Sequence, residues 1–167
     1  MNEYQTDPKV TIFCVRLEKL DMVGKAKLKR CAGQSLEEAR QETVGLFYSL
    51  LPSGVPIHQE NIYFLAATLF GMGKGREQGN FGETMRKVKA VKNKKGLDRR
   101  MTILLDSDSS QLRFRLRQVV QLLKSQQIAV DFPKLLDDLL WWGSEEHYVQ
   151  RRWARAYFAE NQSTRMK

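Results

Sequence analysis

Apolar side chains recur every three or four residues along most of this chain, and this periodicity restricts the fold more than any other feature. One run includes Leu36 and Phe47, and a second includes Ile62 and Leu69. Residues 10–15 are rich in β-branched side chains, but they lack two-residue alternation and are also expected to be helical. All four prolines fall at expected helix ends. The chain is therefore predicted to be all-α, a helical bundle of about eight or nine helices in two packed lobes.

Several helix ends can be predicted from capping residues. Ser35 with Glu38 has the pattern of a capping box, and Pro52 is expected to end the helix that this box starts. Asp131, two residues before a proline, predicts the start of a later helix. Ser144, followed by two glutamates, predicts the start of the last one.

Five glycines between residues 71 and 82, with no apolar period, predict a flexible connection. We expect one domain over residues 1–167. Its helical lobes are expected at roughly 8–72 and 97–160, joined by a glycine-rich and basic segment at 71–96.

The composition indicates a soluble, cytoplasmic protein. No apolar run approaches the length of about 20 residues that spans a bilayer, and the first ten residues lack a secretion-signal pattern. Cys14 and Cys31 have no partner at metal-site spacing, so we interpret them as free, buried thiols. Cys31 follows two basic residues and could be reactive if it is exposed.

Positive charge is concentrated in the middle of the chain. Between Lys74 and Arg100 there are ten Lys or Arg residues against three acidic ones, which gives +7 of the net charge of +9. Charge this dense requires either solvent or a polyanion, and nucleic acid is the leading candidate. A solvated loop is the alternative interpretation.

Further basic clusters lie outside that segment. On a predicted helix at 110–124, Arg113, Arg117 and Lys124 form a stripe beside the buried face and outside the packed arc. Other clusters are Lys25, Lys27, Lys29 and Arg30, and Arg151, Arg152 and Arg155. Such stripes can follow a phosphate backbone, although each alone also suits a solvated face.

Aromatic side chains could stack on unpaired bases. Phe81, in the glycine-rich segment, is the best candidate because burial is least expected there. Trp153 and Tyr157 are expected mainly in the core. Of the adjacent Trp141 and Trp142, one ring is expected to be buried and the other to face a partner.

No residue pattern indicates catalysis. The glycine-rich segment does not match a phosphate-binding loop, because Lys74 is followed by Gly75. Asp108 is expected to cap a helix rather than to pair with Asp106 at a metal. The adjacent Asp137 and Asp138 diverge on their helix, and His58 and His147 lack partners at catalytic spacing. We expect no enzyme activity, no metal and no cofactor.

Three segments of the second half are similar to a known family. DRRMTILLDSDSSQLRFRLRQVV, VDFPKLLDDLLWWG and HYVQRRWARAYF resemble the CasB family, the small subunit of the type I-E CRISPR Cascade complex, and IYFLAATLF is similar more weakly. The resemblance covers roughly residues 57–158. It implies an all-helical, non-catalytic protein that pairs with a second copy and contacts the backbone and large subunits. Guide RNA and target DNA, including the displaced strand, are the implied nucleic-acid partners.

The resemblance also bears on individual basic residues, although departures such as Lys87 leave open which of them make the contacts. Arg100, Arg115 and Arg117 stand at the family's RLR-type arginines, while Lys87 replaces an arginine. Together with the charge clusters, this gives the following predicted nucleic-acid-binding residues: Lys29, Arg30, Lys87, Lys92, Lys94, Lys95, Arg99, Arg100, Arg113, Arg115, Arg117, Arg152 and Arg155.

Two other functions remain open from sequence. A stand-alone helical nucleic-acid-binding protein, such as a regulator or chaperone, would bind DNA tightly without partners, but no helix-turn-helix spacing is evident. A metal-dependent nuclease would need a converging set of carboxylates, which the spacing does not provide.

Overall fold

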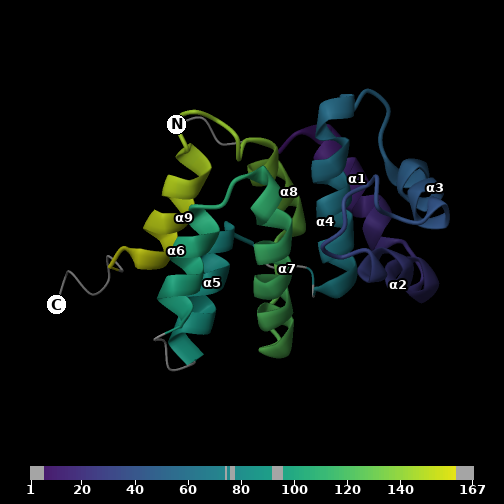
Figure 1. Ribbon diagram of the computed structural model, residues 1–167. Coiled ribbons are helices and arrows are strands. Elements are labelled where there is room, and N and C mark those ends of the chain that lie inside the picture. The colour runs from purple at the N-terminus through teal and green to yellow at the C-terminus, as the bar shows by residue number, and fades with distance from the viewer. Residues whose placement is uncertain (1–5, 74, 76–77, 92–95, 161–167) are drawn as a thin grey trace.

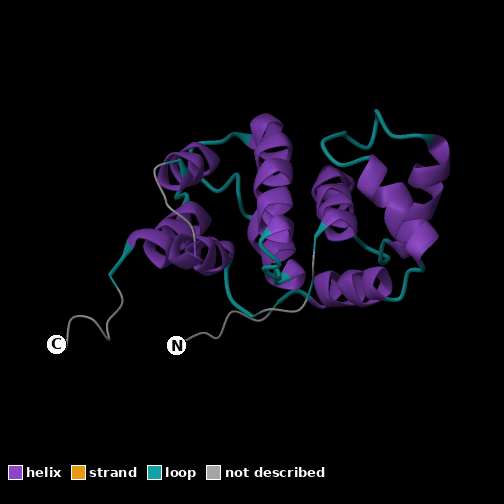
Figure 2. Cartoon of the chain, turned by 90° about the horizontal axis from the view of Figure 1, so that it is seen from below, coloured by secondary structure: helices purple, strands orange, loops and turns teal. Residues whose placement is uncertain are grey.

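Helices form nearly all the regular structure. The computed structural model describes residues 6–73, 75, 78–91 and 96–160. Within these residues there are nine α-helices and one short 3-10 helix, η1 (Figure 2), and the only extended pairing is a bridge between Gly75 and Val130. The elements are α1 (Pro8–Glu18), α2 (Met22–Arg30), α3 (Gln41–Leu50), η1 (Ile57–Gln59), α4 (Glu60–Met72), α5 (Phe81–Val91), α6 (Leu97–Leu105), α7 (Ser109–Ser125), α8 (Phe132–Leu140) and α9 (Tyr148–Phe158). The predicted all-α bundle is confirmed.

The helices form two groups joined by shared elements. In Figure 1, α5, α6 and α9 lie on one side and α1 to α4 on the other, with α7 and α8 between them. Buried side chains form one cluster from α1 to α4 and a second from α5 to α9. Helix α4 belongs to both, because Phe64 packs in the first cluster and Leu69 in the second. Helix α8 also joins them, through Leu136 and Leu135.

Aromatic rings organise the first cluster. The ring of Phe13 meets those of Phe47 and Tyr63 edge-on, with centroids 6.1 and 5.1 Å apart. Cys14 and Cys31 are both buried and free, as predicted. Burial raises the pKa of the Cys14 thiol to about 12, so this thiol is inert at neutral pH.

In the second cluster α5 packs closely on α9. Phe81 is 2% exposed, and its ring centroid lies 5.1 Å from that of Trp153. The prediction that Phe81 is exposed for base stacking is therefore wrong. Phe81, Met85 and Val88 recur at helical spacing, and the glycines before them hid this pattern. A Cβ atom on Gly82 would lie 2.2 Å from the carbonyl oxygen of Trp153, so only glycine allows this helix crossing.

Residues 71–96 contain more structure than a flexible connection. Helix α4 continues to Met72 and α5 begins at Phe81, so both lie partly within the expected linker. Between them, Gly75 bridges to Val130, and the Gly79 amide donates to Asp131 Oδ2 at 3.3 Å. Gly75 and Gly79, between α4 and α5, are thus held against the start of α8.

Most predicted helix ends are confirmed, and two are displaced. Asp131 accepts a hydrogen bond from the Lys134 amide, and Asp108 forms a capping box with Gln111 at the start of α7. The Ser35 hydroxyl does donate to Glu38, but α3 begins only at Gln41, so this pair stabilises a turn. The last helix begins at Tyr148 rather than Ser144, because the segment before it turns through His147 at φ 49°.

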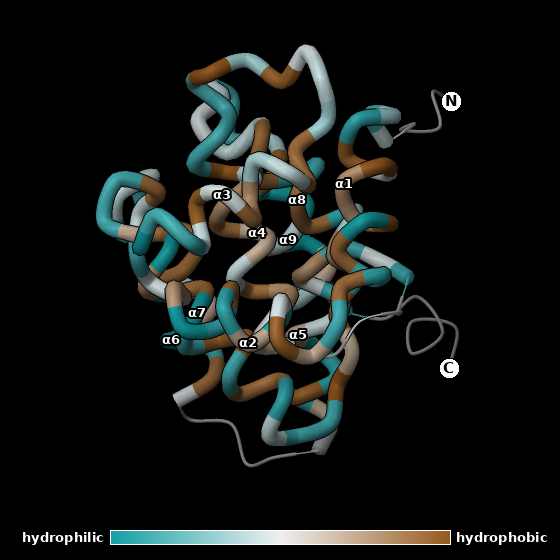
Figure 3. The backbone as a smooth tube through the Cα atoms, turned by 90° about the vertical axis from the view of Figure 1, so that its right-hand side faces the viewer, coloured by the Kyte–Doolittle hydropathy of each residue, from teal (hydrophilic) through white to brown (hydrophobic). Residues whose placement is uncertain are grey.

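Hydropathy follows the helical surfaces. Hydrophobic and hydrophilic residues alternate along the tube within most helices (Figure 3), as expected when one face of each helix is buried. Trp142 is 3% exposed and Trp141 is 53% exposed, which confirms that one ring of this pair is buried and the other is not. Among the described residues, no helix has the length and apolar character needed to cross a bilayer.

Candidate nucleic-acid interface

Helix α2 is placed by a close helix crossing. The Asp21 side chain caps its first turn by accepting from the Gly24 amide at 2.8 Å. A Cβ atom on Gly71 of α4 would lie 2.7 Å from the Lys25 carbonyl oxygen and 3.0 Å from the Lys29 amide nitrogen. This contact of backbone on backbone fixes the last turn of α2 on α4. Lys29 is therefore presented to solvent from a rigid position.

Helix α7 runs beside this turn. Its buried face includes Leu116, Val120 and Leu123, and Arg117 and Lys124 are exposed. Gly33, which follows α2, has φ +90°, and a Cβ there would lie 3.2 Å from an Arg117 guanidinium nitrogen. The Arg117 side chain thus lies along the turn after α2.

Lys29, Arg117 and Lys124 form what we call the basic seam between α2 and α7. The Lys29 ammonium lowers the pKa of Lys124, chiefly through charge repulsion, so these ammonium groups are close together. No carboxylate among the described residues forms an ion pair with any of the three. Neighbouring cations without counter-charges are well placed to share an anionic partner such as consecutive phosphates.

Two predicted arginines make internal contacts instead. Arg113 lies outside the buried face of α7, as expected, but its side chain is only 27% exposed and pairs with Glu38 at 3.5 Å. Glu38 lies opposite Arg113, and Gln34, Ser35 and Glu37 line a pocket together with the start of α7, so this position is less open than helical periodicity alone indicates. Arg115 donates to the Ile103 carbonyl oxygen at 2.9 Å and to Ser107 Oγ at 2.8 Å, which ties α7 to the end of α6.

A second group of predicted residues lies on the other side of the molecule. Lys87 of α5, Arg99 and Arg100 of α6, and Arg152 and Arg155 of α9 are all exposed. Arg152 lies over the Tyr148 ring, with its guanidinium carbon 5.1 Å from the centroid. These side chains share the α5–α6–α9 side of the fold.

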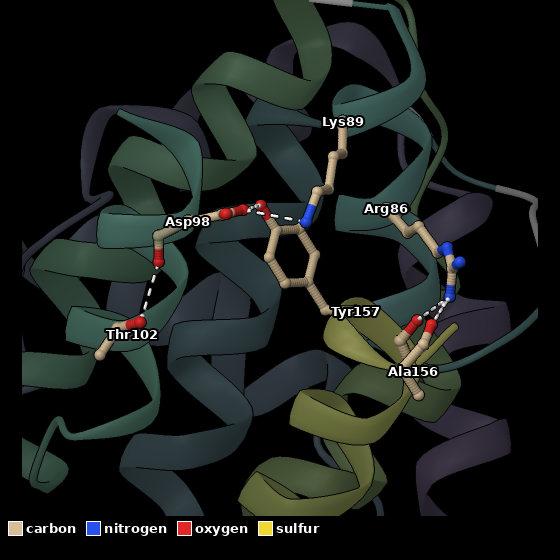
Figure 4. Close-up of polar contacts among 7 residues, drawn as sticks. Arg86, Lys89, Asp98, Thr102, Ala156 and Tyr157 are labelled. Carbon is tan, nitrogen blue, oxygen red and sulfur yellow. Dashed lines mark hydrogen bonds and ion pairs between the residues drawn. The ribbon is translucent and has the colours of Figure 1, made fainter. Parts of the chain in front are cut away.

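The same side contains two basic residues with structural roles (Figure 4). Lys89 lies 3.2 Å from Asp98, which also accepts a hydrogen bond of 2.6 Å from the Tyr157 hydroxyl. Burial and this hydrogen bond raise the pKa of Tyr157 above its ordinary range. Arg86 donates to the Ala156 and Ala159 carbonyl oxygens and so caps the end of α9.

Four predicted binding residues remain, and the structure describes only one of them. Lys92, Lys94 and Lys95 lie outside the described residues. Arg30 is exposed at the end of α2, beside Lys27, which pairs with Glu42.

The carboxylates do not converge. In the described part of the chain, no group of three or more His, Cys, Asp or Glu residues is arranged to hold a metal ion. Asp138 is buried and accepts from the Trp153 indole at 2.9 Å, which identifies it as a packing residue. Asp137 is also buried, and burial raises its pKa.

Sequence reasoning did not find the seam as a unit. It placed Lys29 in one cluster and Lys124 in another, because nothing local connects residues so far apart in the chain. Gly71 is the one signal that could have helped, since a glycine within an apolar helix marks a close helix approach.

Comparisons with known proteins agree with this fold. The family model described as "CRISPR-associated protein Cse2" matches residues 24–158. A CRISPR-associated protein Cse2 from Thermus thermophilus is 35% identical over 111 residues, which cover 65% of this chain and 63% of that protein. The match thus spans less than two thirds of that relative's length.

Solved structures are similar over almost the whole chain. A crystal structure of CasB from M. ruber has a TM-score of 0.76 at 25% identity and covers 92% of this chain and 94% of its own. A chain of a CRISPR RNA-guided surveillance complex has a TM-score of 0.75 at 20% identity, with coverage of 89% and 91%. At that identity the second likeness is one of fold.

Proposed function

Because the chain belongs to the CRISPR-associated protein Cse2 family, we propose that it is the non-catalytic small subunit of a type I-E CRISPR Cascade complex. In this role it binds guide RNA and target DNA, including the displaced strand, without reading sequence. Its other partners are the backbone and large subunits and a second copy of itself, in the cytoplasm. The fold shared with a chain of a CRISPR RNA-guided surveillance complex supports a place in such an assembly.

The observation that carries the nucleic-acid part of this proposal is the basic seam. Lys29, Arg117 and Lys124 are exposed, belong to rigid helices and have no described carboxylate as an ion-pair partner. The repulsion that lowers the pKa of Lys124 is relieved when a phosphate lies between the ammonium groups. Binding at the seam should therefore favour closely spaced anions.

Contacts of this kind suit guide-directed recognition. Base pairing supplies the sequence specificity, and exchange of a DNA duplex for an RNA–DNA duplex is nearly balanced in free energy. A few backbone contacts that exist only in the opened state can therefore shift the balance. The seam supplies such contacts without any base-reading group.

The direct test uses the isolated chain and single charge removals. Lys29→Gln and Lys124→Gln should each reduce the slope of log K against log salt on duplex DNA by about 0.9. Lys19→Gln is the matched control, because Lys19 is an exposed lysine at the end of α1, away from the seam. Equal slopes for all three variants would exclude the seam as a phosphate contact.

A second test places the subunit in its assembly. In reconstituted Cascade, the double variant Lys29→Gln/Lys124→Gln should assemble normally but open target DNA less completely, as followed by permanganate footprinting. Complete and long-lived opening would refute the proposed role. Tight DNA binding by the isolated chain at physiological salt would favour a stand-alone binding protein instead.

A further inference from the structure

The ring of Phe114 lies beside the basic seam. It is 50% exposed on α7, in the turn before Arg117. A Cβ atom on Gly33 would lie 3.9 Å from Phe114 Cδ1 and 3.2 Å from an Arg117 guanidinium nitrogen, so the ring and the guanidinium are neighbours. At about 100° per residue, Phe114, Arg117 and Lys124 fall within an arc of about 80° on the helix. The ring therefore continues the surface of the seam.

A fixed side chain covers one face of this ring. The Arg113 guanidinium carbon lies over the Phe114 ring, 5.0 Å from its centroid. Arg113 is in turn tied to Glu38 by their ion pair of 3.5 Å. Because half of Phe114 is still exposed, the exposed area lies mainly on the opposite face and the edge of the ring. The ring is thus an ordered aromatic surface, which a flat ligand can cover at little cost in side-chain freedom.

The charges beside the ring indicate what covers it. Lys29, Arg117 and Lys124 have no ion-pair partner among the described carboxylates. An apolar side chain from another protein would cover the ring but leave these three cations unmatched. An unpaired nucleotide supplies both a flat base for the ring and phosphates for the cations. A base inside a duplex is already stacked on its neighbours, so its faces are not available to the ring.

We propose that Phe114 stacks on an unpaired base of a strand whose phosphates follow the basic seam. Helix α7 rises about 1.5 Å per residue, so Lys124 lies about 15 Å along the helix from Phe114, a length that a few nucleotides can cover. The inference rests on the proposed nucleic-acid role of the seam and adds the substrate class, a single strand. Phosphate contacts alone are made to single and double strands alike, so the ring is the group that favours the opened state.

The test measures binding of the isolated full-length chain to two fluorescent strands of about 12 nucleotides at low salt, by anisotropy. One strand is oligothymidylate, and the other has the same sugar-phosphate backbone without bases. Phe114→Leu keeps an apolar side chain on the helix but removes the ring. It should weaken binding to oligothymidylate at least about fivefold more than binding to the abasic strand. Phe114→Tyr retains a ring and should restore the preference for oligothymidylate.

Phe158→Leu is the matched control. Phe158 is 45% exposed, and its ring also lies near a cation, with Lys89 Nζ 5.6 Å from the centroid. It ends α9, which lies on the other side of α7 from α2 (Figure 1), and is therefore remote from the seam. Loss of this ring should change binding to neither strand.

Three outcomes of these titrations would overturn the proposal. They are equal weakening of both strands by Phe114→Leu, no weakening of either, or the same loss of preference in Phe158→Leu. In reconstituted Cascade, failure of Phe114→Leu to assemble would identify the ring as a protein contact and would also refute stacking.

The salt dependence of binding to the abasic strand tests the seam separately. Lys29→Gln should reduce the slope of log K against log salt by about 0.7 on a single strand. A reduced slope, together with an unchanged preference of Phe114→Leu for oligothymidylate, would refute stacking and leave the role of the seam intact. An unchanged slope would count against the seam itself and against the proposal that depends on it.

Discussion

The contact of α5 with α9 predicts that Gly82→Ala destabilises the protein. The added Cβ would lie 2.2 Å from the Trp153 carbonyl oxygen, where real contacts are at least 3.0 Å, so the two helices must separate by about 1 Å. The clash is between the new Cβ atom and a backbone carbonyl oxygen, so rotation of a side chain cannot relieve it. This separation loosens the packing of Phe81 and Met85 against Trp153. It should lower the free energy of unfolding by about 2–3 kcal/mol, as at other overpacked sites.

The measurement is urea unfolding followed by circular dichroism. With a slope of about 2 kcal/mol per molar urea, this cost lowers the midpoint by about 1 M. Gly45→Ala is the control, because a Cβ on Gly45 of α3 would have no neighbour within 4 Å. That change should raise stability by up to about 1 kcal/mol, because alanine favours helix. A Gly82→Ala midpoint at or above wild type would refute the packing argument.

Three further predictions follow from polar groups. Asp98→Ala should cost about 1 kcal/mol in urea unfolding, because the Tyr157 hydroxyl loses its acceptor; no loss would show that water replaces it. Burial raises the pKa of Asp137 above 3.8, so the folded state holds this proton more tightly than the unfolded state. As pH falls from 7 towards 3.8, wild type should therefore gain stability relative to Asp137→Asn, and a constant difference would contradict this. Cleavage assays with magnesium, manganese or zinc should show no nuclease activity, and cleavage abolished by Asp106→Ala or Asp108→Ala would contradict the proposed non-catalytic role.

Sequence predicted the helices well, because their determinants are local. Apolar spacing and the caps at Asp108 and Asp131 depend on residues within one or two turns. Prediction from sequence was wrong where a contact between residues far apart in the chain determines whether a side chain is buried or where a helix begins. Phe81 follows several glycines, and its burial depends on Trp153, which lies far along the chain. The Ser35–Glu38 pattern has the chemistry of a helix start but forms a turn.

The candidate interface was predicted only in part, for the same reason. Charge clusters identified Lys29 and Arg117 from composition and helical phase, but they also included Arg113 and Arg115, whose guanidinium groups make internal contacts. Distinguishing a free arginine from an engaged one requires knowing which backbone carbonyl or carboxylate lies opposite. That information comes from the contacts that α6 and Glu38 make with α7.

The sharing of α8 between the two clusters has a consequence for synthesis on the ribosome. Helix α1 packs against α8, and Leu136 completes the cluster that contains Phe13 and Phe47. During elongation, α1 to α4 emerge from the ribosome well before Leu136. Until α8 has been synthesised, their apolar surfaces therefore lack one of their packing partners. Chains in this interval expose hydrophobic surface and are vulnerable to aggregation and to chaperone capture. The first cluster in sequence order therefore closes only after most of the second has been synthesised.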